Sequence, residues 1–195
     1  MSRTAIVERN TSETQVRVEL NLDGGGKADI TTGVPFLDHM LRHVAVHGLF
    51  DLEIRARGDL EIDAHHTVED VAIVLGSALD QALGERQGIT RIAHSFVPMD
   101  EALALVAIDL SGRGYAVIQA EFNAPSLGTM PASLVAHFLE TLAVRARMNL
   151  HGKVFYGRDD HHRAEALFKA LGRALGQAAV VNPRRQVVST KGSLV

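Results

Sequence analysis

The chain contains no cysteine among its 195 residues and carries almost no excess charge. Without thiolates, iron–sulfur clusters and structural zinc–thiolate sites are disfavoured, and the composition suits a reducing compartment. A formal net charge of −3 provides no broad basic surface for a nucleic acid. Long apolar runs are also missing: none reaches about 18 residues, and the N-terminus lacks the charged-then-apolar pattern of a signal peptide. We therefore expect a soluble cytoplasmic protein that binds neither nucleic acid nor membrane.

Histidine, by contrast, occurs in a repeated pattern. The pentad His-His-x-x-Glu stands at 65–69 and again at 161–165. A chain of this composition would contain such a pentad by chance only roughly 0.03 times. Imidazole and carboxylate groups are ligands of borderline divalent metals, and each pentad opens a probable helix. The pattern indicates metal binding more strongly than it indicates two polar helix starts.

The pentads belong to a longer internal repeat. Placing the first pentad over the second also aligns the helical sequences that follow, and slightly different shifts align the earlier segments, as loop insertions would cause. The simplest explanation is a duplicated half-domain, with one copy over 1–93 and the other over 94–195. Pairs matched by the repeat include His39/His137, His65/His161, His66/His162, Glu69/Glu165, Gly76/Gly172 and Glu13/Glu101.

Helix geometry limits how these ligands can be used. Residues three or four apart share a helix face, so a pentad glutamate can converge with one of its histidines, while the two adjacent histidines point in different directions. One pentad therefore suits two metals better than one. Six histidines and two glutamates, divided evenly, would give two sites of three imidazoles and one carboxylate, with open positions left on an octahedral ion. Ligand chemistry allows Mn²⁺, Fe²⁺, Co²⁺ or Zn²⁺ and does not say which histidine serves which ion.

Hydrophobic patterns predict the same order of elements in both halves. Each half begins with two strands that a glycine-rich turn would join as a hairpin, and it continues with a helix, a strand and a long helix. Each half is thus predicted to be a two-layer α+β unit, with helices covering one face of a sheet. The expected strands cover 14–22, 27–32, 49–56, 103–110, 115–122 and 148–155; the expected helices follow Pro35 and Pro131 and cover 67–84 and 163–180.

Groups that could hold a phosphate are scattered along the chain. Lys169 lies four residues after Glu165, so both project from one helix face. Arg91 follows a Gly-Ile-Thr turn, Arg113 lies in the second glycine-rich turn, and hydroxyls and an ammonium occur over 189–192. Together they could bind a phosphate through charge-assisted hydrogen bonds, although each alone is typical of a solvated surface.

Four segments carry a resemblance to a known family: Phe36-Leu37-Asp38-His39-Met40-Leu41, Asp63-Ala64-His65-His66-Thr67-Val68-Glu69-Asp70, Asp109-Leu110-Ser111-Gly112-Arg113 and His161-His162-Arg163-Ala164-Glu165-Ala166-Leu167-Phe168-Lys169. Together they resemble the imidazoleglycerol-phosphate dehydratase family of histidine biosynthesis. The resemblance runs from about Arg9 to Leu194, nearly the whole chain, and the combined motifs are highly specific.

The resemblance implies loss of water from D-erythro-imidazole glycerol phosphate to give imidazole acetol phosphate. It also implies two Mn²⁺ per active site, a duplicated α+β fold of the ribosomal-protein-S5-domain-2-like type, and a homo-oligomeric 24-mer with active sites at subunit contacts. Carried over by position, the metal ligands would be His39, His65, His66, Glu69, His137, His161, His162 and Glu165; the phosphate would be bound by Arg91, Arg113, Lys169, Ser189 and Lys191; and the catalytic base would be Glu13.

The reaction gives a reason for two metals. The hydrogen that is removed sits on a carbon without a neighbouring carbonyl, so simple enolate formation is not open. Metals on both ring nitrogens would favour an imidazolate, which expels the adjacent hydroxyl and gives a diazafulvene-like intermediate. A base then takes the side-chain proton, and the resulting enol becomes the ketone. Glu101 is the repeat partner of Glu13, and symmetry alone does not say which of the two is catalytic.

Other interpretations remain open at this point. A dinuclear metallohydrolase would use metal-bound hydroxide, although such sites usually contain bridging aspartates. A non-catalytic metal store would not need open coordination positions. His43 stands where many family members have glutamine, so a substrate contact could differ there. Finally, sheets covered on one side leave an apolar face to bury, so we expect self-association, and ligands shared between subunits would make the assembly mass fall on chelation.

Overall fold

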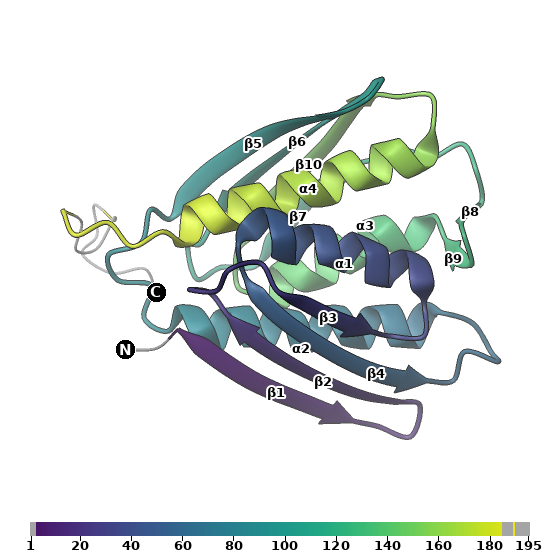
Figure 1. Cartoon of the computed structure of the whole chain (residues 1–195), viewed down its shortest axis with the longest axis horizontal. Coiled ribbons are helices and arrows are strands. Elements are labelled where there is room, and N and C mark those ends of the chain that lie inside the picture. Colours follow the sequence, from purple (N-terminus) through teal and green to yellow (C-terminus); the bar gives the residue numbers. More distant parts are fainter. Residues whose placement is uncertain (1–2, 185–188, 190–195) are drawn as a thin grey trace.

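Two similar halves make up the chain in a computed structural model, which describes residues 3–184 and 189. Figure 1 shows the two large sheets on opposite outer sides, with the helices between them. The first half contains β1 (Thr4–Asn10), β2 (Thr14–Asn21), β3 (Ala28–Thr31), α1 (Pro35–Gly48), β4 (Asp51–Gly58) and α2 (His65–Leu83). The second half contains β5 (Ile92–Met99), β6 (Ala102–Asp109), β7 (Tyr115–Gln119), β8 (Ser126–Leu127), β9 (Met130–Pro131), α3 (Ser133–Arg145), β10 (Asn149–Tyr156) and α4 (Asp160–Ala179).

The duplication predicted from the repeat is confirmed by the topology. One sheet has the strand order β1-β2-β4-β3 and the other has the matching order β5-β6-β10-β7. In each, the last strand pairs in parallel and the other neighbours pair antiparallel. The chain is thus the predicted α+β duplication. β5 begins at Ile92, next to the boundary expected at residue 93, and the boundary itself stays a prediction.

The predicted hairpins between β2 and β3 and between β6 and β7 are wrong. β4 lies between β2 and β3, and β10 lies between β6 and β7. The glycine-rich loop after β2 instead crosses the start of β4. The two segments are so close there that a Cβ at Gly24 would collide with the backbone nitrogen of Asp51. The Asp51 carboxylate accepts hydrogen bonds from the N–H groups of Gly25 and Lys27. Glycine here permits a close crossing, whereas the sequence pattern was read as a tight turn.

Two edge strands, β1 and β5, were not among the predicted elements. β1 is exposed along most of its length, so it lacks the alternation that a half-buried strand shows. β5 does alternate, but it contains Pro98, which an edge strand tolerates because one side of its backbone needs no partner.

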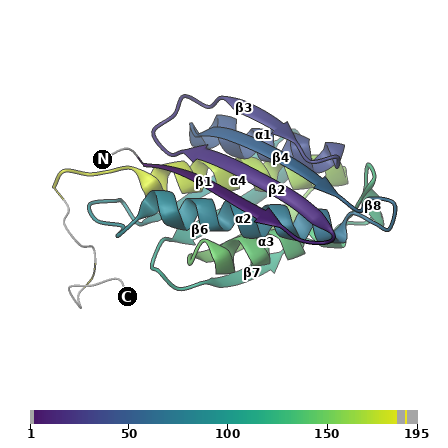
Figure 2. The same ribbon diagram turned by 90° about the horizontal axis from the view of Figure 1, so that it is seen from below.

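The helices pair across the two halves. α1 packs along α4, and α2 packs along α3, as both Figure 1 and Figure 2 show. A Cβ at Gly76 of α2 would lie 2.6 Å from the Cβ of Arg145 in α3, so glycine allows this close approach. The predicted apolar stripes, which include Met40 and Phe138, are buried in the shared core. Helices of different halves are therefore held close enough for their polar side chains to meet.

The outer faces of the two sheets differ in polarity. The first presents a charged row formed by Glu19, Glu53 and Asp29, whose Cα atoms are paired across the strands. The second presents Phe96 and Phe155, whose stacked rings are 5.8 Å apart. The expected apolar face thus exists on one sheet only. No helix in the described part of the chain is long and apolar enough to cross a membrane, and the cytoplasmic location stays a prediction.

Candidate metal centre

Both pentads begin long helices, as predicted. The N–H of His65 donates to Asp63 at 2.7 Å, and the N–H of His161 donates to Asp159, the N-cap of α4, at 2.8 Å. In each pentad, an aspartate two residues earlier therefore holds the first histidine. The adjacent rings in both pentads are perpendicular, with interplanar angles of 88°. One of the two adjacent histidines can therefore face the helix that packs beside its own, while the other points in a different direction.

The first histidine group consists of His39 and His43 of α1 with His161 and Glu165 of α4. One oxygen of Glu165 lies 3.3 Å from Nε2 of His39 and 3.1 Å from Nε2 of His161. Nε2 of His43 lies 3.4 Å from that of His39 and 3.5 Å from the other oxygen of Glu165. The glutamate is 8% exposed, so a nearly buried carboxylate is surrounded by imidazoles.

The second histidine group consists of His65 and Glu69 of α2 with His137 of α3. The rings of His65 and His137 are 4.8 Å apart, and Nε2 of His137 lies 3.3 Å from an oxygen of Glu69. That nitrogen is buried and has no hydrogen-bond partner among the described residues. A buried nitrogen lone pair aimed at a carboxylate fits a bound cation, since leaving it unsatisfied would otherwise cost about 1–3 kcal/mol.

Each group joins the two halves of the duplication. The first combines α1 of the first half with α4 of the second, and the second combines α2 with α3. The repeat pairs His39 with His137 and therefore could not show that each of them meets the pentad of the opposite half. Six of the eight predicted ligands are brought together in this way: His39, His161 and Glu165 in the first group, and His65, Glu69 and His137 in the second. Neither His66 nor His162 joins the compact groups found among the described residues.

Electrostatics favour the metal-ready protonation states in the first group. Burial would raise the pKa of Glu165, but the hydrogen bond from Lys169 and the nearby His43 outweigh it and lower that pKa to about 2. Burial lowers the pKa of His43 to about 4, so its imidazole is neutral at neutral pH. His43 was interpreted from sequence only as a possible substrate contact. Its spacing of four residues from His39 was the signal that both share one helix face.

The remaining pentad histidines are held by carboxylates from loops. Nδ1 of His66 lies 2.9 Å from Asp59, and Nδ1 of His162 lies 2.8 Å from Glu101. These hydrogen bonds raise the pKa of both imidazoles. Glu13, the predicted base, lies 3.8 Å from Nδ1 of His66. A carboxylate on Nδ1 fixes the ring and directs Nε2 outward as a ligand, which is a common arrangement around metals.

The predicted phosphate-binding residues are not all brought together. Lys169 contacts Glu165 in the first histidine group. Arg91 instead forms an ion pair with Asp109, and its backbone N–H binds the carbonyl of Ala178 near the far end of α4. At 1.5 Å per residue, that end lies about 25 Å along the helix from its first turn.

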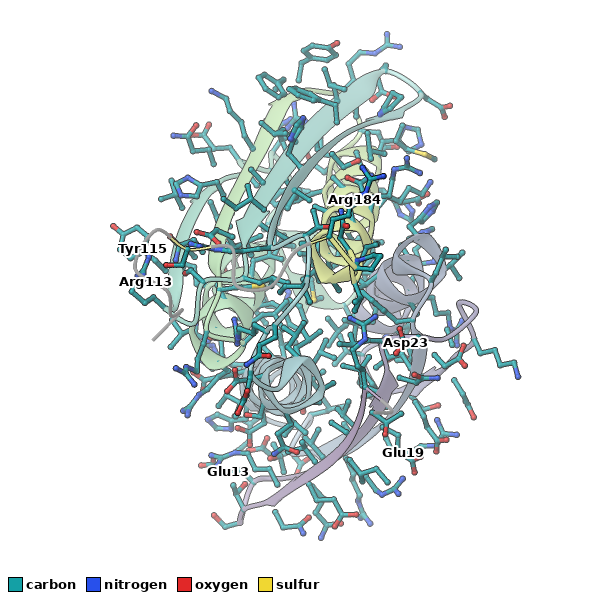
Figure 3. The ribbon with its side chains drawn as sticks, turned by 90° about the vertical axis from the view of Figure 1, so that its left-hand side faces the viewer. Glu13, Glu19, Asp23, Arg113, Tyr115 and Arg184 are labelled. Carbon is teal, nitrogen blue, oxygen red and sulfur yellow. The ribbon has the colours of Figure 1, made fainter. Side chains whose placement is uncertain are left out.

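Arg113 also lies far from the first turn of α4. It precedes β7 and is seen beside Tyr115 in Figure 3. Tyr115 pairs with Asn149 at the start of β10, whereas α4 follows the other end of that strand. Ser189 is described as a single residue of the C-terminal tail, whereas Lys191 lies outside the described residues. One chain therefore does not gather the predicted arginines around its own histidine groups.

The chain is similar to imidazoleglycerol-phosphate dehydratases by three comparisons. The family model of that description matches residues 32–175. The enzyme of Chloroflexus aggregans is 60% identical over 195 residues, covering 99% of this chain and 95% of the relative. The enzyme of Methanothermobacter thermautotrophicus is 55% identical over 192 residues, covering 98% of each chain.

Solved structures of the same description share the fold. The enzyme from Pyrococcus furiosus, crystallised in a ligand complex, superposes with a TM-score of 0.83 at 39% identity, covering 95% of this chain and 99% of that one. The enzyme from Staphylococcus aureus gives a TM-score of 0.82 at 34% identity and covers 91% of this chain and 100% of that one.

Proposed function

Because this chain belongs to the imidazoleglycerol-phosphate dehydratase family, we propose that its two histidine groups are the metal sites at which D-erythro-imidazole glycerol phosphate loses water. Family membership makes the protein a hydro-lyase of histidine biosynthesis. The substrate loses one side-chain hydrogen and the hydroxyl next to the ring, and the enol that remains rearranges to imidazole acetol phosphate. A single observation carries the proposal: two imidazole–carboxylate groups, each assembled from both halves of the duplication.

We assign two Mn²⁺ ions to the active site, with the first histidine group holding one and the second holding the other. The buried, unpartnered nitrogen of His137 supports this assignment. So does the donor set, because imidazole and carboxylate suit Mn²⁺ among other divalent ions. The ions would supply Lewis-acid and templating chemistry for the imidazole ring. Around them, Glu165 is held as an anion by Lys169, and His43 is kept neutral by burial.

The active site is completed by neighbouring copies in this proposal. His66 and His162 turn away from the groups on their own chain, and Arg91 lies at the far end of α4. Another copy can supply what each group lacks: a further imidazole for the metal and arginines for the substrate phosphate. The apolar outer face carrying Phe96 and Phe155 provides a contact for assembly, and the family resemblance suggests a 24-mer.

The remaining roles fall to Glu13, Lys169 and the C-terminal tail. Glu13 is the base that accepts the side-chain proton, because it is half exposed beside His66. Lys169, together with Ser189 and Lys191 of the tail, would bind the phosphate as charged and hydroxyl donors. Ser189 is partly buried, and Lys191 is assigned by position alone.

A Mn²⁺-dependent dehydration assay tests the proposal. Wild-type protein should convert imidazole glycerol phosphate only when Mn²⁺ is present, and Glu69→Ala should abolish turnover. Glu85→Ala is the matched control, because Glu85 is an exposed carboxylate in the turn that follows the same helix. Hydrolysis of a generic phosphoester without dehydration would instead identify a metallohydrolase, and Mn²⁺ binding with neither activity would identify a metal store.

A further inference from the structure

The duplication places Glu13 and Glu101 at equivalent positions with different surroundings. Each precedes the second strand of its sheet, β2 or β6, in the turn after the edge strand. Each also lies near the second histidine of a pentad, His66 or His162. Equivalent origin would predict equivalent contacts, so the differences between the two sites show what has changed since the duplication.

Glu101 uses both of its oxygens. One accepts hydrogen bonds from the N–H groups of Arg158 and Asp159, each at 2.8 Å. The other lies 2.8 Å from Nδ1 of His162. Three hydrogen-bond donors thus occupy this carboxylate. Glu101 therefore orients His162 and is a poor acceptor for a substrate proton.

Glu13 lacks these contacts. Its carboxylate makes no hydrogen bond to the residues that the structure describes, and its side chain is 53% exposed. The nearer oxygen is 3.8 Å from Nδ1 of His66, which exceeds hydrogen-bonding distance. Asp59 takes that nitrogen instead, at 2.9 Å, and Asp59 is only 14% exposed. The other oxygen of Asp59 is buried without a hydrogen-bond partner in the described chain, so its placement is explained by His66 alone.

The loop before the first pentad is longer than the loop before the second, and this difference explains why His66 and His162 have different carboxylate partners. Gly58 pairs with the first residue of β2, and Gly157 packs against the first residue of β6, so these glycines are equivalent. Asp63 and Asp159, which accept the N–H of the first histidine in each pentad, are equivalent as well. Four residues separate Gly58 from Asp63 (63 − 58 − 1), whereas one separates Gly157 from Asp159 (159 − 157 − 1). The three additional residues place Asp59 beside His66. In the part of the chain that the structure describes, Glu13 has no counterpart of the backbone donors that hold Glu101.

We propose that Asp59, and not Glu13, orients His66, which leaves Glu13 available as the base, whereas Glu101, the repeat partner of Glu13, orients His162. Asp59 and Glu101 are positioning residues, because each acts through the histidine whose Nδ1 it binds, leaving Nε2 for a metal. The inference rests on the proposed function for the role of Glu13. The orienting roles themselves concern metal affinity and can be measured without turnover.

Isothermal titration with Mn²⁺, combined with the dehydration assay, separates the two kinds of carboxylate. Glu101→Gln should weaken Mn²⁺ binding about 10–100-fold. Glu13→Gln should keep wild-type Mn²⁺ affinity and lose turnover about 10²–10⁴-fold. Equal loss of Mn²⁺ affinity in Glu13→Gln and Glu101→Gln would overturn the division of roles.

The Asp59→Ala variant gives the sharper test. With Asp59 removed, Glu13 can move onto Nδ1 of His66, so Mn²⁺ affinity should fall only slightly while turnover falls. Adding Glu13→Gln to Asp59→Ala should then weaken Mn²⁺ binding about 10-fold or more, although the same change costs nothing in wild type. Unchanged Mn²⁺ affinity in the double variant would overturn the proposal, and Asp59→Asn provides a variant of unchanged size if alanine disturbs the loop. If wild-type protein binds Mn²⁺ but does not dehydrate the substrate, the proposed function fails, while the affinity comparisons still decide the orienting roles.

Discussion

Gly172 of α4 lies directly against Val44 of α1: a Cβ added at Gly172 would stand 2.7 Å from the Val44 carbonyl oxygen. Real Cβ atoms are not found so close to a backbone oxygen, so the helices can run at this spacing only because residue 172 has no side chain. One consequence is chemical. His39 and Glu165, which come from opposite halves, approach to 3.3 Å a few turns away.

We predict that Gly172→Ala destabilises the protein and weakens Mn²⁺ binding by the first histidine group. Forcing the helices apart should cost about 1–3 kcal/mol, partly offset by about 1 kcal/mol from the better helix propensity of alanine. In a chain of this size each kcal/mol corresponds to roughly 2–4 °C in Tm. Calorimetry of the metal-free protein measures the first effect, and Mn²⁺ titration measures the second.

Gly25→Ala is the control for this change, because a Cβ at Gly25 would meet no atom within 4 Å. Its Tm and Mn²⁺ affinity should match those of the wild type. A Gly172→Ala protein as stable and as tightly metal-binding as wild type would show that the helix spacing does not support the site.

The two histidine groups should lose their metals independently. Glu165→Ala removes the carboxylate of the first group and Glu69→Ala that of the second, so each variant should retain about one Mn²⁺ per chain where the wild type retains about two. Elemental analysis after gel filtration gives the ratio. Loss of both ions from either single variant would show that the two histidine groups form one shared site.

Assembly should depend on the second sheet and not on the first. Phe96 and Ile6 are both exposed apolar residues on outer sheet faces, at 55% and 59%, but only Phe96 belongs to the apolar face. Phe96→Asp should therefore lower the assembly mass measured by light scattering, whereas Ile6→Asp should leave it unchanged. Removing metal with a chelator should lower the mass of wild-type protein, because His66 and His162 would no longer connect copies. If both substitutions left the mass unchanged, contact through this sheet would be ruled out.

Acid should remove a stabilising contribution from Glu101 in metal-free protein. Its hydrogen bonds, first that from Asp159, lower its pKa from the ordinary 4.5 to about 2. The folded state therefore binds the proton less readily than the unfolded state. The contribution is fully present above pH 4.5 and is lost as the pH falls toward 2. Urea titrations across this range should show a shallower loss of stability in Glu101→Gln, and identical slopes for both proteins would contradict the assignment.

The sequence predicted the helices and the duplication better than it predicted which elements are neighbours. The pentads, the repeat and the stripes containing Met40 and Phe138 are local patterns, so they identified the helices and the duplication. The strand order was missed because Gly24 looks like a turn residue, and only the position of Asp51 shows that it allows a crossing. Pairing of strands and helices depends on contacts between distant segments, which local periodicity does not record.

The site shows the same limit. Repeat symmetry assigned matching roles to His39 and His137, but it could not show that each meets the opposite half. Asp59 was missed because its role depends on three additional loop residues that bring its carboxylate to His66. Spacing within one helix indicated that Lys169 would lie beside Glu165, and the structure confirms this contact.

Anomalous scattering from crystals grown with Mn²⁺ would test the central claim most directly. We expect two manganese peaks per chain, one within bonding distance of His39, His161 and Glu165 and the other of His65, Glu69 and His137. Each ion should also contact the second histidine of a pentad, His66 or His162, from a neighbouring copy. Peaks located elsewhere, or ions held without any residue from another copy, would contradict a metal centre that is built across the halves and completed by assembly.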